Sequence, residues 1–320
     1  MGLPIVAIVG PTASGKTRLS VALCQRIPGE VISMDSMQIY RGMDVGTAKP
    51  TQDERGGVAH HMLDVADPGE AYTVSRYREE AARAIEQVAS RGRLPVLVGG
   101  TGLYLNALTY RMTLGEATGD EAIRERLRAV AAAPGGRARL HAMLAAVDPV
   151  SAARLHENDV RRVVRALEVY EVTGKPISQR QDDRVPDERY APLIYGLEME
   201  RERLYARIDA RVDEMMAAGL EREVRALTAC GLWPEDEGAM QAIGYKEIAF
   251  ALRGAYGMDE AVRLIKRESR RYAKRQMTWF RADARVRWIR WEDYASAQEL
   301  EEAFVARVRA DLDELKEIQP

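Results

Sequence analysis

In Gly10-Pro11-Thr12-Ala13-Ser14-Gly15-Lys16-Thr17 the chain carries a complete G-x-x-x-x-G-K-T motif. The motif follows an apolar β-branched run and precedes a helical pattern. A strand, a glycine loop and a helix in this order predict a phosphate-binding loop, because the glycines let successive backbone N–H groups point at one anion. Lys16 adds a positive charge, and the Thr17 hydroxyl can ligate Mg²⁺. The motif therefore predicts a bound di- or triphosphate and leaves its identity open.

The fold class follows from the alternation of apolar runs and helical patterns. Short β-branched runs, typical of buried strands, occur at residues 5–9, 31–33, 95–98, 193–197 and 286–291. Helical periodicity between most of them predicts a parallel sheet covered by helices. We expect helices at about residues 15–27, 74–91, 102–110, 121–132, 137–146, 160–173, 200–229, 240–253, 259–282 and 296–317. The expected fold is therefore α/β, with a P-loop kinase-like parallel-sheet core.

A segment in the middle of the chain interrupts this alternation. Residues 116–190 contain no convincing strand pattern, only short helical patterns separated by breaks that contain Pro and Gly. We expect an all-helical insertion domain there. The first part of the α/β core would then occupy residues 1–115, and residues 191–320 would complete it with basic C-terminal helices.

The composition of the 320-residue chain is typical of a soluble globular protein. Hydrophobic residues make up 46%, yet no apolar run approaches the roughly 18 residues of a membrane span. No charged-then-apolar leader precedes the first strand, so we expect a cytoplasmic protein with no membrane partner. The two cysteines, Cys24 and Cys230, are too few for a disulfide framework or a zinc site.

The formal net charge of −2 would argue against a nucleic-acid partner if the charges were evenly spread, but they are not. The expected helix at 259–282 carries Lys266, Arg267, Arg270, Arg271, Lys274, Arg275 and Arg281, interleaved with Tyr272, Trp279 and Phe280. Such a helix can follow a phosphate backbone while its aromatic side chains stack on a base. A solvated charged face over a core stripe is the alternative. A second basic group lies in the expected insertion and comprises Arg161, Arg162 and Arg165.

Two polar residues follow expected strands at the sheet edge that carries the phosphate loop. Asp35 follows the second strand, and Thr101 follows the next central strand. Because parallel strands present their carboxyl ends at one edge, we expect both side chains in the ligand crevice. There the carboxylate can act as a general base, and Thr101 can bind a departing phosphate oxygen or a substrate amine. Helix capping or a turn is the alternative role for each.

The end of the central strand differs from that of a typical nucleoside triphosphatase. Such enzymes place an aspartate there, which holds Mg²⁺. This chain has Gly99, Gly100 and Thr101 instead. The usual machinery for hydrolysing a γ-phosphate is therefore missing, whereas the loop that binds a polyphosphate is retained.

Two arginines are candidates for a further contact with a diphosphate. Arg207 and Arg211 lie four residues apart in a predicted helix, and they could close a guanidinium clamp over the anion. An exposed stripe of ion pairs is the alternative.

Seven separated motifs resemble those of the tRNA dimethylallyltransferase family, also called tRNA isopentenyltransferases. Besides the phosphate loop they are DSMQIYRGMD at 35–44, GTAKP at 46–50, GGTGLY at 99–104, RALEVY at 165–170, QAIGYKE at 241–247 and YAKRQMTWFR at 272–281. The resemblance covers nearly the whole chain in order. It implies a transferase that moves a dimethylallyl group from dimethylallyl diphosphate to tRNA and releases diphosphate, with Mg²⁺ as cofactor.

The resemblance also implies that the insertion domain at residues 116–190 binds tRNA, and it implies roles for individual residues. Asp35 would be the general base on N6 of the adenosine just 3′ of the anticodon, flipped out of its stack, and Thr101 would position that amine and help the diphosphate to leave. The diphosphate would bind to Gly10, Pro11, Thr12, Ala13, Ser14, Gly15, Lys16 and Thr17, with the metal on Thr17, and to Arg207 and Arg211. The anticodon stem-loop would contact Asp35, Ser36, Met37, Gln38, Thr101, Arg124, Asp159, Val160, Arg161, Arg162, Val163, Gln241, Ala242, Ile243, Gly244, Tyr245 and Lys246, and Arg281 of the basic helix.

Two other functions are compatible with a phosphate loop of this kind. A small-molecule or nucleoside kinase predicts an arginine-rich lid over ATP and a metal-holding aspartate after the central strand, and the sequence shows neither. A catalytically inactive RNA-binding protein is the second alternative, against which the intact Lys16, Thr17 and Asp35 argue. No obligate protein partner is evident, and we expect a monomer.

Overall fold

The structure is a computed structural model that describes residues 2–112, 120–179, 185–234 and 238–317. The chain forms two compact units. The first comprises Met1–Thr109 and Asp187–Pro320, and the second comprises Tyr110–Pro186. The boundary expected between residues 115 and 116 lies outside the described residues.

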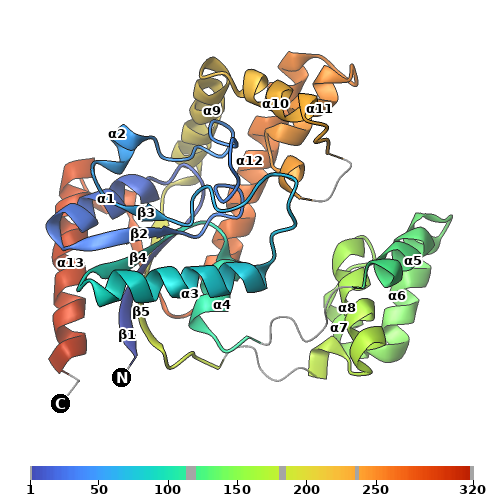
Figure 1. The fold of residues 1–320 in the computed structure, drawn as a ribbon, viewed down its shortest axis with the longest axis horizontal. Coiled ribbons are helices and arrows are strands. Elements are labelled where there is room, and N and C mark those ends of the chain that lie inside the picture. The colour runs from blue at the N-terminus through green and yellow to red at the C-terminus, as the bar shows by residue number, and fades with distance from the viewer. Residues whose placement is uncertain (1, 113–119, 180–184, 235–237, 318–320) are drawn as a thin grey trace. The chain divides into compact units, whose positions relative to one another are not determined.

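The first unit is built on a six-stranded parallel sheet in the order β3-β2-β4-β1-β5-β6 (Figure 1). The strands are β1 (Leu3–Val9), β2 (Gly29–Ser33), β3 (His60–His61), β4 (Leu94–Gly99), β5 (Tyr190–Glu198) and β6 (Val286–Arg290). In the register of the sheet, Val6 lies between Val96 of β4 and Leu193 of β5. The expected parallel sheet is thus confirmed. The two-residue β3 had no recognisable apolar run and was not predicted.

Alternate residues of the central strand pack on opposite faces of the sheet. Val6 and Ile8 of β1 belong to one core cluster with α1 and α13, whereas Ile5, Ala7 and Val9 belong to another with α3 and α4. Because both faces are covered, the strand is apolar throughout rather than alternating. The helices involved are α1 (Lys16–Arg26), α3 (Val74–Ser90), α4 (Gly102–Thr109) and α13 (Ala297–Glu317).

The remaining helices of this unit are α2 (Gln52–Arg55), α9 (Arg201–Ala217), α10 (Leu220–Ala229), α11 (Tyr245–Leu252) and α12 (Met258–Arg281). Two expected helices need correction. The helix expected at 200–229 is two helices, because Gly219 adopts a φ of 100° and ends the first. The helix expected at 240–253 begins only at Tyr245, after Gly244, which also has a φ of 100°.

A third core cluster joins the segment after β2 to these helices. Ile39, Tyr40 and Met43 pack with apolar side chains of α9 to α12, such as Leu220 and Ile265. The segment that follows Asp35 is therefore anchored on helices that lie far away in the sequence.

The second unit contains α5 (Glu121–Ala132), α6 (Gly136–Val147), α7 (Pro149–Arg154) and α8 (Val160–Thr173). These four helices enclose a small core around Leu127, Leu140, Leu144 and Leu167. The prediction of a helical middle region is confirmed. Among the described residues of the whole chain, no helix is long and apolar enough to cross a membrane.

The first prediction concerns the close approach of Gly99, at the end of β4, to the backbone of Met34. A Cβ at position 99 would lie 2.1 Å from the Met34 carbonyl oxygen, and this clash is with backbone atoms, so no side chain can move to relieve it. We expect Gly99→Ala to lower the free energy of unfolding by roughly 1–3 kcal/mol, measured by urea denaturation.

Gly69→Ala is the matched control, because a Cβ there would meet only the Leu232 side chain at 3.6 Å. An equal loss of stability in both variants would contradict the backbone clash.

Candidate functional site

The loops that follow β1, β2, β4 and β5 all leave the sheet at its carboxyl edge. The loop after β1 is the expected phosphate loop, and its backbone has the required form: Gly10 and Gly15 have φ values of 143° and 93°, and Ala13 has a φ of 62°. Helix α1 begins at Lys16, directly after Gly15. The Lys16 Nζ donates a hydrogen bond to the Pro11 carbonyl at 2.7 Å, so the side chain curls over the loop.

Two side chains from the C-terminal part of the chain hold this loop, and the sequence reasoning assigned neither. The Gln276 amide accepts a hydrogen bond from Thr12 N at 2.9 Å and donates one to the Gly100 carbonyl at 3.0 Å. The Trp291 indole N–H donates to the Ser14 carbonyl at 2.8 Å. Gln276 therefore ties the phosphate loop to the loop that carries Thr101. Its place in the motif at 272–281 was the only sequence signal.

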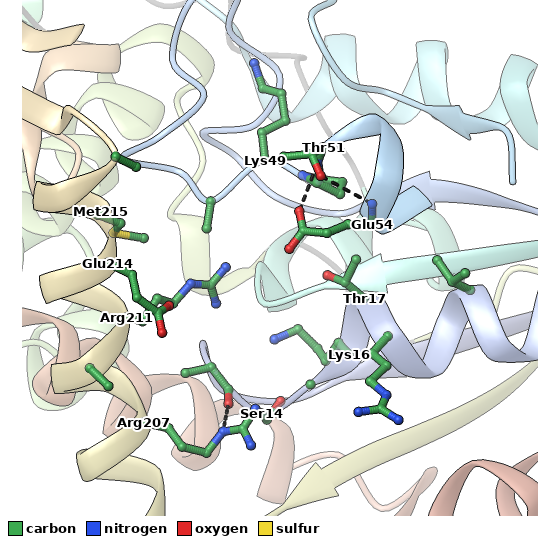
Figure 2. A pocket seen from close by; sticks show the side chains of 18 of the residues that line it. Ser14, Lys16, Thr17, Lys49, Thr51, Glu54, Arg207, Arg211, Glu214 and Met215 are labelled. Carbon is green, nitrogen blue, oxygen red and sulfur yellow. Dashed lines mark hydrogen bonds between the residues drawn. The ribbon is translucent and has the colours of Figure 1, made fainter. Parts of the chain in front are cut away.

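A cavity of about 1060 Å³ lies in front of the phosphate loop (Figure 2). Its walls come from the loop itself, α1, residues 44–54 and α9. The polar and charged side chains that line it include Ser14, Lys16, Thr17, Lys49, Thr51, Glu54, Arg207, Arg211 and Glu214. The cavity is therefore rich in cationic groups on the side where the loop N–H groups lie.

Arg207 and Arg211 both line the cavity, as the clamp hypothesis requires. Arg207 Nε donates to the Ala13 carbonyl at 2.9 Å, and its guanidinium lies over the Trp291 ring. Burial lowers the pKa of both arginines, and neither has an ion-pair partner among the described residues. Arg207 is exposed, as the alternative of an exposed stripe expects, but neither side chain forms an ion pair with another described residue, and the guanidinium clamp stays a prediction.

Lys16 has an unusual pKa for a lysine. Burial and the positive charge of Arg211 lower it to about 7, although the negative charge of Asp35 opposes the shift. The surroundings of Lys16 therefore disfavour its positive charge, and a bound anion would relieve this penalty.

Asp35 and Thr101 meet at the ends of β2 and β4. The Asp35 Oδ1 accepts hydrogen bonds from Met37 N at 2.9 Å and Gln38 N at 3.4 Å, and Thr101 Oγ1 accepts one from Ser36 N at 3.2 Å. One carboxylate oxygen of Asp35 thus stabilises the turn, which is the alternative role given for this residue. The other, Oδ2, has no hydrogen-bond partner in the part of the chain that the structure describes, which leaves it able to accept a proton.

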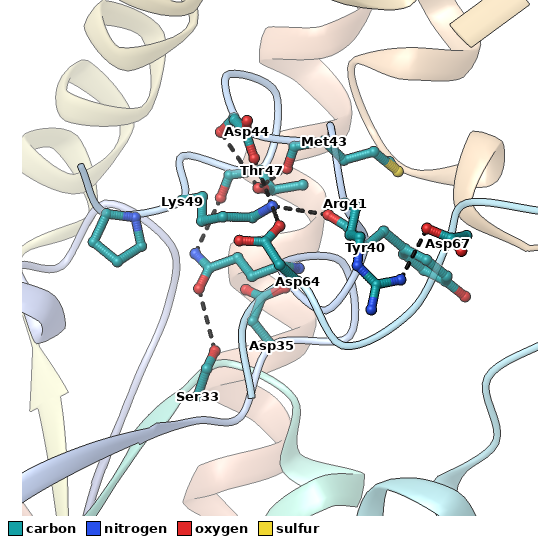
Figure 3. Close-up of polar contacts among 12 residues, drawn as sticks. Ser33, Asp35, Tyr40, Arg41, Met43, Asp44, Thr47, Lys49, Asp64 and Asp67 are labelled. Atoms are coloured by element: carbon teal, nitrogen blue, oxygen red, sulfur yellow. Dashed lines mark hydrogen bonds and ion pairs between the residues drawn. The ribbon is translucent and has the colours of Figure 1, made fainter. Parts of the chain in front are cut away.

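The segment after Asp35 is held by a buried lysine (Figure 3). Lys49 Nζ donates to the Tyr40 carbonyl at 2.8 Å and pairs with Asp44 and Asp64, each at 2.5 Å. The side chain of Lys49 is only 4% exposed. Lys49 lies in the GTAKP motif at 46–50, from which no role for this side chain was predicted. The structure shows that it fixes the shape of residues 40–64.

A carboxylate of α10 fixes the same segment from the other side. Glu223 accepts hydrogen bonds from the backbone N–H groups of Asp44, Val45 and Gly46, and from the Tyr245 hydroxyl at 2.5 Å. The motifs at 46–50 and 241–247 therefore meet on one carboxylate.

Several residues expected to contact RNA are occupied within the protein. Gln38 bonds the Thr47 and Ala48 carbonyls and Ser33, and the Gln241 amide donates to the Pro234 carbonyl. Ala242, Gly244 and Tyr245 are buried, whereas Ile243 and Lys246 are partly exposed. Since Tyr245 is fully buried, RNA contact through this side chain is wrong for this structure.

The expected contacts in the second unit divide in the same way. Val163 is buried in the helical core, so its side chain serves packing and not RNA contact. Arg124 pairs with the buried Glu168 at 2.7 Å, as does Arg165. Arg161 and Arg162 are exposed, Asp159 pairs with Arg162 at 3.4 Å, and Val160 is partly exposed.

The basic face of α12 is less free than its sequence indicates. Acidic side chains of α9 pair with Lys266 and Arg270, and Glu268 pairs with Arg267 and Arg271. Arg281 pairs with Glu198. The sequence reasoning counted only neighbours along the chain and therefore missed Asp209 and Asp213, which α9 brings to this helix. Lys274 and Arg275 have no ion-pair partner among the described residues.

Comparisons with known proteins connect this geometry to one group of enzymes. A family model described as IPP transferase matches residues 38–283, and one described as isopentenyl transferase matches residues 3–69. A tRNA dimethylallyltransferase of Symbiobacterium thermophilum is 52% identical over 90% of both chains, and one of Geobacillus kaustophilus is 50% identical over 92% of both.

Solved structures agree. The tRNA isopentenylpyrophosphate transferase of Bacillus halodurans superposes with a TM-score of 0.75 at 44% identity and covers 100% of this chain and 99% of its own. A eukaryotic dimethylallyltransferase described as acting on tRNA gives a TM-score of 0.74 at 29% identity, over 90% of this chain and 74% of its own.

The second prediction concerns proton uptake at Lys16. With a pKa of about 7, the side chain is mostly neutral at pH 8 in the free protein, and a bound anion raises this pKa. We expect inorganic pyrophosphate to bind at about pH 8 with uptake of about one proton more than in Lys16→Arg, in which residue 16 is always charged. Calorimetry in buffers of different ionisation enthalpy measures the difference.

Because Lys16 loses its positive charge above pH 7 and an arginine does not, the affinity of the unchanged protein for pyrophosphate should fall relative to that of Lys16→Arg as the pH rises above about 7. Identical proton uptake in the two proteins would contradict the lowered pKa.

Proposed function

Because the chain belongs to the tRNA dimethylallyltransferase family, we propose that it transfers a dimethylallyl group from dimethylallyl diphosphate to N6 of the adenosine on the 3′ side of the anticodon. The family rests on the IPP transferase match over residues 38–283 and on relatives that are about half identical over nine-tenths of the chain. In the reaction a C–N bond forms at N6, the C–O bond to the diphosphate breaks, and N6 loses a proton.

One observation supports this reaction above others. The cationic groups that line the cavity interact electrostatically with the carboxylate of Asp35 at the same edge of the sheet. Lys16 and Arg211 line the cavity, and the negative charge of Asp35 partly offsets the lowering of the pKa of both by burial. A leaving diphosphate and an acceptor amine can therefore be served by adjacent groups. A kinase needs an acidic metal ligand after the central strand, where Gly100 and Thr101 stand.

In the proposed mechanism the protein neutralises the leaving group and orients the amine. The N–H groups of the phosphate loop, Lys16 and the two arginines Arg207 and Arg211 stabilise the charge that develops on the diphosphate as its bond to carbon breaks. The free Oδ2 of Asp35 takes the proton of N6. Thr101, whose Oγ1 is already bound to the turn through Ser36 N, positions the amine.

Mg²⁺ is the proposed cofactor. The Thr17 side chain lines the cavity, and among the described residues no group of three metal-ligating side chains forms an all-protein cage. This donor set fits Mg²⁺, which commonly takes one or two protein oxygens and completes its shell with phosphate oxygens and water. When bound, the ion would offset negative charge on the diphosphate.

The proposed RNA contacts exclude the buried side chains. The anticodon stem-loop would meet Asp35, Ser36, Met37, Gln38 and Thr101 beside the acceptor amine. Further contacts would come from exposed or partly exposed residues, namely Arg124, Asp159, Val160, Arg161, Arg162, Gln241, Ile243, Lys246 and Arg281. We propose that the enzyme acts as a monomer in the cytoplasm.

The third prediction tests the general base. Asp35→Asn keeps an oxygen for the turn and removes the proton acceptor, so we expect kcat for prenylation of an anticodon stem-loop to fall by about 10²–10⁴-fold. The affinity for inorganic pyrophosphate should change far less. Product formation is followed by mass spectrometry of the RNA.

Asp53→Asn, on exposed α2, is the control and should behave as the unchanged protein. A protein that consumes ATP but never modifies the stem-loop would overturn the proposed function, and full activity of Asp35→Asn would exclude this base.

The fourth prediction concerns the metal. Removal of Mg²⁺ with a chelator should abolish transfer. Thr17→Ala should raise the Mg²⁺ concentration needed for half-maximal rate, whereas Thr17→Ser keeps the hydroxyl and should stay close to the unchanged protein. The measurement is the initial rate against Mg²⁺ concentration, and identical curves for the two variants would speak against Thr17 as a ligand.

A further inference from the structure

Two large apolar side chains are exposed in the described part of the first unit: Leu103 at 40% and Trp279 at 42%. Both lie at the loop that carries Thr101. Leu103 follows Thr101 by two residues, and the Trp279 ring lies so close to Gly102 that a Cβ there would be 2.1 Å from Cδ1. Single exposed apolar side chains are common, but here both stand at the edge of the acceptor site.

An unpaired cation stands beside the tryptophan. Arg275 precedes Trp279 by four residues in α12, so that the two side chains share a face of the helix. Its guanidinium lies over the Tyr272 ring, 5.6 Å from the centroid, and no described residue forms an ion pair with it. Nearer the start of α12, by contrast, five basic residues are paired with carboxylates. We call Leu103, Arg275 and Trp279 the α4–α12 rim.

We propose that the α4–α12 rim binds the unpaired nucleobase adjacent to the acceptor adenosine, with the Trp279 indole stacked on the base and Arg275 on its phosphate. This inference rests on the proposed function. When the adenosine leaves its stack to reach Asp35, the neighbouring base loses its stacking partner. An aromatic side chain next to Thr101 replaces that partner, and a guanidinium complements the backbone charge.

Other occupants fit the rim less well. None of its three residues lines the diphosphate cavity, so it does not serve the prenyl donor. A stable protein interface covers about 800 Å² on each partner, far more than two apolar side chains supply. The positive charge and the position beside the acceptor site favour RNA.

The test compares variants of Trp279 in prenylation of an anticodon stem-loop. Loss of one base–aromatic stack weakens binding by roughly 5- to 150-fold, and we expect Trp279→Ala to raise KM for the stem-loop by a factor in this range. Trp279→Leu keeps an apolar side chain without an aromatic face and should act like Trp279→Ala. Trp279→Phe should recover most of the affinity. The affinity for inorganic pyrophosphate should stay unchanged in all three.

A direct readout uses 2-aminopurine, whose fluorescence is quenched by stacking, placed in turn on each side of the acceptor adenosine. One position should be quenched in the complex and regain its emission with Trp279→Ala. Thr278→Ala, the exposed neighbour on α12, is the control and should leave both KM and emission unchanged.

The outcomes separate this inference from the function on which it rests. If the unchanged protein does not prenylate the stem-loop, the proposed function fails. If it does, but Trp279→Ala and Trp279→Leu keep its KM and its 2-aminopurine emission, the α4–α12 rim does not bind a base. If these variants prenylate the stem-loop at the rate of the unchanged protein, the exposed rim binds another partner, such as a protein.

Discussion

The side-chain amide of Gln276 joins the phosphate loop to the loop that carries Thr101, and we propose that the reaction takes place between these two loops. Its oxygen accepts from the phosphate loop at Thr12, and its nitrogen donates to Gly100, one residue before Thr101. The pairing of β1 with β4, which places Val9 opposite Gly99, brings the two loops to one edge of the sheet. Beyond the strand ends, the amide of Gln276 on α12 adds a buried polar contact to both loops. The arrangement of the two loops thus depends on strand pairing and on this one side chain.

Three cationic side chains that form no ion pair with a described residue determine the electrostatics at the carboxyl edge of the sheet. Lys16, Arg207 and Arg211 have no carboxylate partner among the described residues, and burial lowers the pKa of each. For the partly buried Lys16 and Arg211 this costs stability, because charge is removed from water without a compensating carboxylate. The diphosphate that we propose as ligand would supply the missing negative charge and so stabilise the bound state.

Two other charged side chains, Lys49 and Glu223, are fully satisfied and hold the segment after Asp35 in place. Lys49 is satisfied by two aspartates and a carbonyl, and Glu223 by three backbone N–H groups and a hydroxyl. Both act on the segment after Asp35, which has no regular structure of its own between β2 and α2. A loop with such anchors can hold a catalytic carboxylate as firmly as a helix would.

Local sequence was enough to predict the phosphate loop, the parallel sheet, the helical middle region and the strand-end positions of Asp35 and Thr101, because each depends on turn chemistry, periodicity or strand direction. It could not predict that Gln276 reaches Thr12 across 264 residues, that Asp209 and Asp213 neutralise part of α12, or that Tyr245 is buried. These features come from packing between distant segments. Spacing along the chain carries no information on which side chains such packing brings together, or on which charges it leaves without a partner.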